Sequence, residues 1–246
     1  MLEVCRLNIH AGETALVEDL SLTLATGRLT CLIGPSGCGK SSVLKWLAGV
    51  LAPELRVTGE ARLDGVALTL PDRAIAYQPQ QDTLFPWLTI LENAALGLEI
   101  RGSARAVARR EVQALFPAFG LAGHEQSFPD QLSGGMRQRA AVLRTLVQKA
   151  DVMLLDEPFS ALDAVTRLAM QDWLLTRLEE TPRAVLMVTH DLFEATQIAD
   201  RVLVMARGPG RIIADIAIPT PRAGRSEAAL AETRSALKTL LLEDTR

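Results

Sequence analysis

One short segment limits what this chain can fold into more than any other. It consists of Gly34, Pro35, Ser36, Gly37, Cys38, Gly39, Lys40 and Ser41, and Ser42 comes directly after it. An apolar run at 29–33 precedes the segment, and a run with helical character at 42–50 follows it. This order of buried strand, glycine-rich turn and helix is typical of a loop that wraps around phosphate groups.

Each residue type in the segment has its own physical reason to be there. Glycines let the backbone fold closely around a phosphate chain, and the N–H groups of the turn and of the helix start point at an anion. Lys40 adds a positive charge that can reach the β and γ phosphates, and the Ser41 hydroxyl can bind Mg²⁺. The alternative is an ordinary glycine-rich turn with a chance Lys-Ser pair, which the flanking strand and helix argue against.

The composition sets broad limits. The chain has 246 residues, 48% of them hydrophobic, which is enough for the core of one domain or of one domain with an extra lobe. A net charge of −3 and scattered basic residues give no indication of a nucleic-acid surface. Cys5, Cys31 and Cys38 lack metal-ligand spacing and favour a reducing compartment. Neither a signal peptide nor a membrane span of ~20 apolar residues is expected.

The first part of the chain is rich in predicted strands, and the middle part is helical. Apolar runs predict strands at 2–8, 20–25, 29–33, 56–63 and 74–78. Apolar residues at helical spacing then predict helices at 88–98, 104–119 and 134–149. Ser103 is a candidate N-cap for the second of these helices. We therefore expect a helical lobe at 82–150.

From residue 151 onward, short strands alternate with helices. The expected order is strand 152–155, helix 163–180, strand 184–189, helix 192–199 and strand 202–206. Continuous apolar strands that alternate with helices indicate a parallel sheet covered on both faces. A strand at 211–218, a linker at 219–225 and an amphipathic helix at 226–243 follow.

Polar residues follow two of these strands. Asp156 and Glu157 end the strand at 152–155, and His190 follows the strand at 184–189. The carboxyl ends of parallel strands face the ligand crevice, so we expect Asp156 near a cation bound by Ser41 and Glu157 beside an attacking water. The alternatives are a solvated acidic turn and a structural histidine, which a phosphate-binding loop one strand away makes less favourable.

A second helix start has the features of an anion site. In the run from Leu132 to Arg139, Ser133 precedes Gly134 and Gly135, so the first turn exposes backbone N–H groups at the positive end of a helix dipole. An ordinary serine-capped helix would look the same from the spacing alone.

Taken in chain order, these motifs resemble the ATP-binding cassette (ABC) family, and the likeness covers nearly all of residues 1–218. Residues 34–42 match its Walker A loop, and the run from Leu132 to Arg139 matches its signature motif. Asp156 and Glu157 match the Walker B motif with its catalytic base, and His190 matches the switch histidine.

The resemblance implies an α/β fold, with a P-loop NTPase (RecA-like) core, an antiparallel β subdomain and an inserted helical lobe. The core with its β subdomain would take residues 1–81 and 151–218, and the lobe would take 82–150. Residues 219–246 would form a linker and a C-terminal helix.

The resemblance also implies the ligands, ATP and Mg²⁺, and the residues that hold them. Lys40, Glu157 and His190 would be catalytic, and Ser41, Gln80 and Asp156 would hold Mg²⁺. ATP would contact the Walker A residues, Gln80, Ser133, Gly134, Gly135 and Asp163, the last within the D-loop at 160–163. Gln80 lies six residues before Pro86, as in similar importers, but Gln78 and Gln81 leave the register open.

In this family two subunits pair head to tail, and each ATP lies between the Walker A loop of one and the signature helix of the other. ABC subunits usually stack adenine on an aromatic residue. Here Ala11 stands at that place with His10 beside it, so His10 could substitute or ATP affinity could be lower.

The run from Leu84 to Ile90 and the Gly-Pro-Gly-Arg turn at 208–211 resemble the nitrate/sulfonate/taurine importer subfamily. This implies an ATPase subunit of a bacterial importer that energises a transmembrane permease from the cytoplasmic face of the cell membrane. A substrate-binding protein would be an indirect partner, and no nucleic acid is expected. Phe85, Trp87 and Leu88 could line a groove for the permease or lie in the lobe core.

Two other classes of protein were weighed against this interpretation. A soluble ABC ATPase with a non-transport partner usually carries two cassettes or a long inserted coiled coil, for which this chain has no room. A P-loop GTPase or small-molecule kinase is disfavoured, since the guanine-reading Asn-Lys-x-Asp is absent. Nitrate, sulfonate, taurine and thiamine-precursor importers look alike at this level, so the transported substrate stays open.

Overall fold

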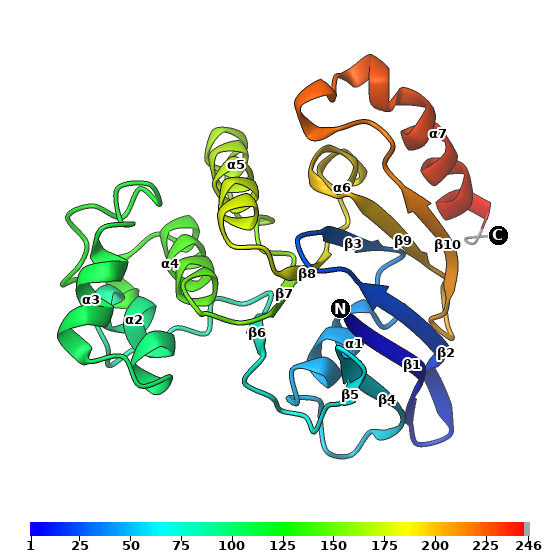
Figure 1. The fold of residues 1–246 in the computed structure, drawn as a ribbon, viewed down its shortest axis with the longest axis horizontal. Helices are drawn as coiled ribbons and strands as arrows, with labels where there is room; N and C mark the ends of the chain where they lie inside the picture. Colours follow the sequence, from blue (N-terminus) through cyan, green and yellow to red (C-terminus); the bar gives the residue numbers. More distant parts are fainter. Residues whose placement is uncertain (244–246) are drawn as a thin grey trace.

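In a computed structural model, the described residues, 1–243, form two β-sheets with helices around them (Figure 1). The smaller sheet is antiparallel, with strand order β2-β1-β4-β5. Its strands are β1 (Leu2–Ala11), β2 (Thr14–Leu24), β4 (Arg56–Leu63) and β5 (Val66–Ala67). The expectation of a β-rich start is therefore confirmed, although β2 begins six residues earlier than the pattern indicated.

The larger sheet has the order β10-β9-β3-β8-β7-β6, and only its edge strand β10 runs antiparallel to its neighbour. Its strands are β3 (Leu29–Ile33), β6 (Ile75–Gln78), β7 (Val152–Asp156), β8 (Ala184–Val188), β9 (Arg201–Met205) and β10 (Ile212–Ala217). Because β3, β7 and β8 are parallel, their carboxyl ends meet at one edge of the sheet.

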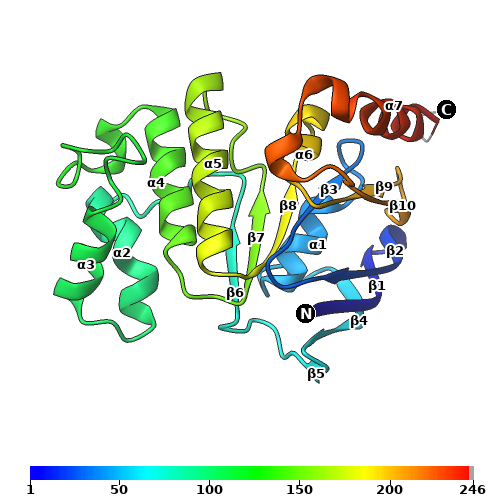
Figure 2. The same cartoon turned by 45° about the horizontal axis from the view of Figure 1, so that its top comes forward.

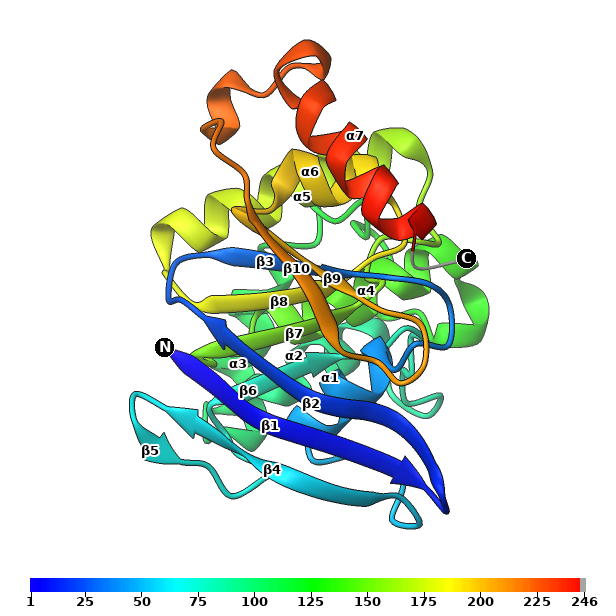
Figure 3. The same cartoon turned by 90° about the vertical axis from the view of Figure 1, so that its right-hand side faces the viewer.

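The central strands are buried on both faces, as their continuous apolar sequences require. On one face, alternate residues such as Leu154 and Leu186 pack against α1 (Lys40–Leu47) and the antiparallel sheet. On the other face, their neighbours Met153 and Met187 pack against helices, among them α5 (Ala164–Glu180) and α6 (Leu192–Ile198). Figures 2 and 3 show these helices and the antiparallel sheet on opposite sides of the larger sheet.

Three helices form a group beside the larger sheet (Figure 1). They are α2 (Ile90–Ile100), α3 (Arg105–Gln113) and α4 (Gly134–Leu146). A short 3₁₀ helix, Pro129–Gln131, precedes α4. The boundaries 82–150 for a separate lobe stay a prediction. The apolar spacing predicted a helix at each of these three places, although the bounds of the helices differ.

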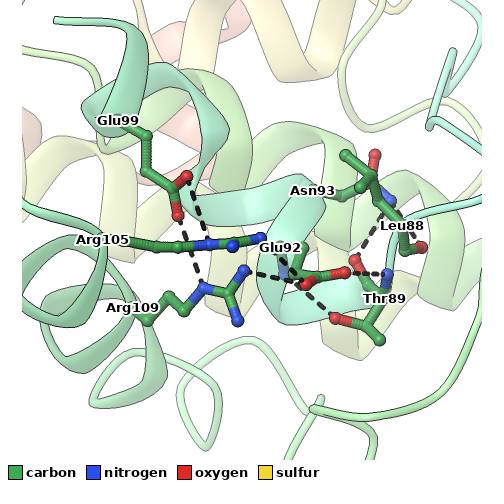
Figure 4. Close-up of polar contacts among 7 residues, drawn as sticks. All are labelled: Leu88, Thr89, Glu92, Asn93, Glu99, Arg105 and Arg109. Atoms are coloured by element: carbon green, nitrogen blue, oxygen red, sulfur yellow. Dashed lines mark hydrogen bonds and ion pairs between the residues drawn. The ribbon is translucent and has the colours of Figure 1, made fainter.

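A network of two acids and two arginines joins α2 to α3 (Figure 4). Arg109 lies 2.8 Å from Glu92 and 3.4 Å from Glu99, and Arg105 reaches the same two carboxylates at 3.4 and 3.8 Å. Glu92 also completes a capping box with Thr89 at the start of α2. Since one carboxylate both caps α2 and pairs with α3, the two helices are fixed relative to each other.

The loop before α2 is held by one buried amide. Asn93 accepts a hydrogen bond from the Phe85 N–H and donates to the carbonyls of Phe85, Leu88 and Thr89. The loop carries the Phe85 and Trp87 rings, whose centroids lie 5.4 Å apart. Trp87 is 69% exposed, so it does not lie in the lobe core, which was one of its two possible places.

Two expectations about α3 were wrong. The helix ends at Gln113 and not at Phe119, because the chain continues as successive turns around Pro117, which has no N–H to donate. These turns keep Phe116 and Phe119 fully buried, which explains why the apolar spacing continued. Ser103 does not cap the helix either: the N-cap is Ala104 and makes no side-chain bond, since Ser103 belongs to the turn that ends α2.

The last helix, α7 (Glu227–Glu243), follows a 3₁₀ turn at Arg222–Gly224 and lies over α6 (Figure 3). Leu230 and Leu237 are fully buried, and Leu240 and Leu241 pack beside them, so the predicted apolar side of this helix is confirmed. Within residues 1–243, the structure has no helix of the length and apolarity that crossing a membrane would take.

Candidate functional site

The glycine-rich loop joins β3 to α1, and two of its glycines pack closely against neighbouring segments. A Cβ on Gly34 would lie 2.5 Å from the Met205 carbonyl oxygen. Gly39 has φ of +99° and is the N-cap of α1, and a Cβ there would lie 2.8 Å from Val17. Only glycine therefore fits these two positions. Since no side chain caps α1, its first N–H groups remain for an anion.

Lys40 lies across this loop. Its side-chain Nζ donates to the carbonyls of Gly34 at 2.8 Å and Pro35 at 2.7 Å, and the residue is only 8% exposed. A buried ammonium needs partners, and here the loop supplies them from its own backbone. The positive charge is thus fixed at the centre of the loop.

Ser41 and Asp156 meet at the edge of the larger sheet. The Ser41 hydroxyl donates to Asp156 Oδ1 at 3.0 Å, although β3 and β7 are separated by β8. Burial raises the pKa of Asp156 above its usual value, and the nearby Glu157 raises it further, while the Ser41 bond acts in the opposite direction. A hydroxyl and a buried carboxylate side by side are hard oxygen donors, which fit a magnesium ion.

Glu157 follows directly, with a left-handed backbone at φ of +48°. Its Oε2 accepts a hydrogen bond from Gln80 Nε2 at 3.2 Å and lies 3.2 Å from His190 Nδ1. The three side chains follow the ends of β6, β7 and β8, and those of Gln80 and His190 meet at one carboxylate oxygen of Glu157. Glu157 is thereby held in position by one amide and one imidazole, and within residues 1–243 no hydrogen bond reaches its other oxygen.

The geometry favours Gln80 over its neighbour Gln78. Gln78 is fully buried, and its amide oxygen accepts a hydrogen bond from the Thr145 hydroxyl of α4 at 2.7 Å. It therefore links β6 to α4 and faces away from Glu157. Of the two, it is Gln80 that reaches the Glu157 carboxylate.

The remaining predicted residues lie elsewhere. Ser133 is the N-cap of α4 and accepts from the Met136 N–H, and Asp163 is the N-cap of α5 and accepts from the Thr166 N–H. Among the described residues no hydrogen bond joins either cap to the glycine-rich loop. Figure 1 places α4 in the helical group and α1 between the two sheets. The described part of the chain therefore does not bring its two candidate anion-binding helix starts together.

Gly210 packs against the glycine-rich loop, which the sequence alone did not indicate. Gly210 donates from its backbone N–H to the Leu16 carbonyl at 2.9 Å and accepts from the Glu18 N–H at 3.0 Å. A Cβ on Gly210 would lie 2.1 Å from the Cys38 carbonyl oxygen. The Gly-Pro-Gly pattern predicted a turn, but nothing in it indicated that this turn lies against the phosphate-binding loop.

Comparison with known proteins identifies the family of this chain. The model of the family described as ABC transporter matches residues 17–160. The chain belongs to the ABC transporter family. It is an ATP-binding and ATP-hydrolysing subunit of that family, and the likeness to the nitrate/sulfonate/taurine subfamily is confirmed.

Its relatives include three subunits named for import. The aliphatic sulfonates import ATP-binding protein SsuB 2 of Burkholderia cenocepacia (strain HI2424) is 41% identical over 92% of this chain and 82% of its own length. The formylaminopyrimidine import ATP-binding protein ThiZ of Halalkalibacterium halodurans is 35% identical over 96% and 93%. The taurine import ATP-binding protein TauB of Yersinia pestis bv. Antiqua (strain Antiqua) is 39% identical over 83% and 78%.

Solved structures give the same fold. An ATP-binding subunit of an ABC transporter superposes over the whole of both chains with a TM-score of 0.82 and 25% identity. A dimeric ATP-binding cassette in a post-hydrolysis state, bound to ADP and Pi, has a TM-score of 0.78 and 25% identity. That comparison covers 90% of this chain and 100% of the other.

We predict that Gly210→Ala weakens ATP binding about tenfold or more, equivalent to ~1.4 kcal/mol. The added methyl group would push the Cys38 carbonyl and distort the loop. Gly208→Ala is the matched control in the same turn, since a Cβ there meets nothing within 4 Å. Titration of both variants with a fluorescent ATP analogue measures the effect, and equal affinities would contradict it.

We predict that Asp156→Asn raises the melting temperature of the nucleotide-free protein in EDTA at pH 7.5 while abolishing hydrolysis. Because folding raises the pKa of Asp156, ionisation of this carboxyl lowers the free energy of unfolding. The loss of stability builds up as the pH rises from about 3.9, the ordinary aspartate value, to the raised pKa. The asparagine does not titrate, so its advantage should shrink toward pH 4. A wild-type protein of equal or higher stability at pH 7.5 would rule this out.

Proposed function

We propose that this chain is the ATP-hydrolysing subunit of a bacterial importer and works as a head-to-tail dimer. Each ATP would lie between the glycine-rich loop of one subunit and the Ser133–Gly135 helix start of the other. The observation that supports this most is the separation of these two anion-binding helix starts within one chain. Phosphoryl transfer needs positive charge and N–H donors around the γ-phosphate, and a single chain offers only half of them.

In this proposal the loop residues bind the triphosphate. The N–H groups of residues 37–41 hold the β-phosphate, and Lys40 exchanges its contacts to loop carbonyls for phosphate oxygens. Ser41, Asp156 and Gln80 would hold Mg²⁺, which supplies neutralising charge to the β and γ phosphates. That ion would also stabilise the ionised Asp156 carboxylate in its buried position.

The hydrolytic step is assigned to Glu157. Its Oε2 is held by Gln80 and His190, so its other oxygen can orient an attacking water and accept a proton from it. His190 is mostly exposed and can donate to the γ-phosphate as charge develops there. The segment that leads to the Asp163 cap of α5 lies beside the Ser133–Gly135 turn, where we place the twin subunit: a Cβ on Gly135 would lie 3.7 Å from the Ala161 carbonyl oxygen.

The partner on the membrane side would be a permease. The exposed Phe85–Trp87 pair, held by Asn93, gives an apolar surface next to the segment that carries Gln80. A permease that contacts this surface could sense the position of Gln80 in the ATP site. The subunit would then be peripheral, at the cytoplasmic face of the membrane, and a substrate-binding protein would act on it only through the permease.

We predict that Glu157→Gln binds ATP and dimerises but turns over ~10²–10⁴-fold more slowly, the range expected for loss of a general base. The amide keeps the shape of the side chain but cannot accept the proton. Size-exclusion chromatography with ATP reports the dimer, and phosphate release reports turnover. Hydrolysis at the wild-type rate would remove Glu157 from this role.

We predict that Gly135→Glu leaves ATP binding by the monomer intact but prevents the ATP-dependent dimer in the Glu157→Gln background. The new carboxylate would face the γ-phosphate of the twin subunit and repel it. Val107→Glu is the charge-matched control in the same helical group, because Val107 is 59% exposed on α3. Sedimentation with and without ATP separates the two, and a Gly135→Glu dimer of normal stability would refute the composite site.

A further inference from the structure

The C-terminal segment, residues 219–243, attaches to the chain mainly through α6. Figure 3 shows α7 lying over α6 on the helical side of the larger sheet. Three arginines of this segment, Arg222, Arg225 and Arg234, all donate hydrogen bonds to residues of α6. Since α6 begins two residues after His190, this attachment concerns the ATP site.

Two of the arginines hold the end of α6. Arg225 Nη1 donates to the Gln197 carbonyl at 2.7 Å, and Arg222 Nε donates to the Ile198 carbonyl at 3.2 Å. These carbonyls lie in the last turn, where a helix has unsatisfied acceptors and the negative end of its dipole. The guanidinium groups supply both the missing donors and the compensating charge.

The third arginine holds the middle and the start of α6. Arg234 is only 8% exposed, its Nε donates to the Thr196 hydroxyl at 2.8 Å, and it pairs with Glu227 of its own helix. Its guanidinium lies 4.5 Å from the centre of the Phe193 ring, in the range of a cation–π contact. Thr196 is fully buried, and its hydroxyl donates to the Leu192 or Phe193 carbonyl, so Arg234 is connected to the first turn.

That first turn begins just after His190, with Asp191 as its N-cap. Asp191 caps α6 by accepting from the Phe193 and Glu194 N–H groups at 2.8 and 3.1 Å. Its own N–H donates to the Thr189 hydroxyl at 3.0 Å. The His190 backbone is therefore fixed between the end of β8 and the cap of α6. Any rotation of α6 would move the His190 ring relative to Glu157.

A helix of seven residues is too short to be stable by itself. The position of α6 must come from its neighbours, which include α5 and α7. Gln171 of α5 donates to the buried Glu194 at 2.9 Å on one side, and Arg234 bonds to Thr196 on the other.

We propose that Arg234 is a positioning residue for ATP hydrolysis: it holds α6 so that His190 stays beside Glu157, and the C-terminal segment thereby sets the turnover rate. This rests on the hydrolytic role proposed above for His190. Arg234 bonds to Thr196 and Glu227 and lies over the Phe193 ring, and none of these belongs to the proposed ATP site. Its loss should lower kcat and leave the KM for ATP nearly unchanged, because none of these partners lies in the glycine-rich loop.

The test combines Arg234→Met with His190→Ala in a double-mutant cycle. Arg234→Met alone should lower kcat about 3- to 10-fold, the usual size of an indirect coupling. In the His190→Ala background the same change should have no further effect. Lys238→Met is the matched control, since it removes a positive charge from the exposed side of α7. An equal loss with and without His190 would overturn the proposal.

A second variant guards against a simple loss of folding. Thr196→Val keeps the volume but removes the hydroxyl that accepts from Arg234, and it should lower kcat without adding to the effect of Arg234→Met. Circular dichroism melting identifies variants that are only unstable. If His190→Ala itself keeps full turnover, the proposed role of His190 fails. If His190→Ala lowers turnover but the effects of Arg234→Met and His190→Ala are independent of each other, the role of Arg234 fails and that of His190 stands.

Discussion

The parallel pairing of β3 with β8 and of β8 with β7 sets the distance on which the ATP site depends. It brings the Ser41 hydroxyl to 3.0 Å from Asp156, although 115 residues separate them in the chain. The same pairing buries the Asp156 carboxylate and raises its pKa. Ionisation of this carboxylate therefore destabilises the folded chain, as is common at functional sites.

Much of this could be predicted from the sequence, because the decisive signals are local. Continuous apolar runs of four to six residues indicated buried parallel strands, and polar residues at their ends indicated a shared edge. That argument put Glu157 and His190 at the same edge, where the structure has their side chains 3.2 Å apart, while their chemical roles stay a prediction. The Walker A and signature motifs are also contiguous, so their glycines and caps could be recognised without any knowledge of the fold.

The parts that could not be predicted depend on contacts between distant segments. Gly210 is one of 17 glycines, and only the folded chain shows its α-carbon against the Cys38 carbonyl. Arg234 looks like an ordinary polar position on an amphipathic helix, yet it is buried against Thr196. The end of α3 was missed for the opposite reason, since the turns around Pro117 bury Phe116 and Phe119 at a spacing that imitates a helix.

These distant contacts meet at α6. Arg167 of α5 lies 3.5 Å from Asp191, and Gln171 of α5 holds Glu194, while α7 holds the other side of the helix through Arg234. The segment that leads into α5 lies beside the Ser133–Gly135 turn, where we place the twin subunit, so arrival of the twin would move one support of α6. The C-terminal segment supplies the other support, and His190 lies at the end of the helix between them. A short helix held from two sides would therefore let both dimer closure and the C-terminal segment act on the same imidazole.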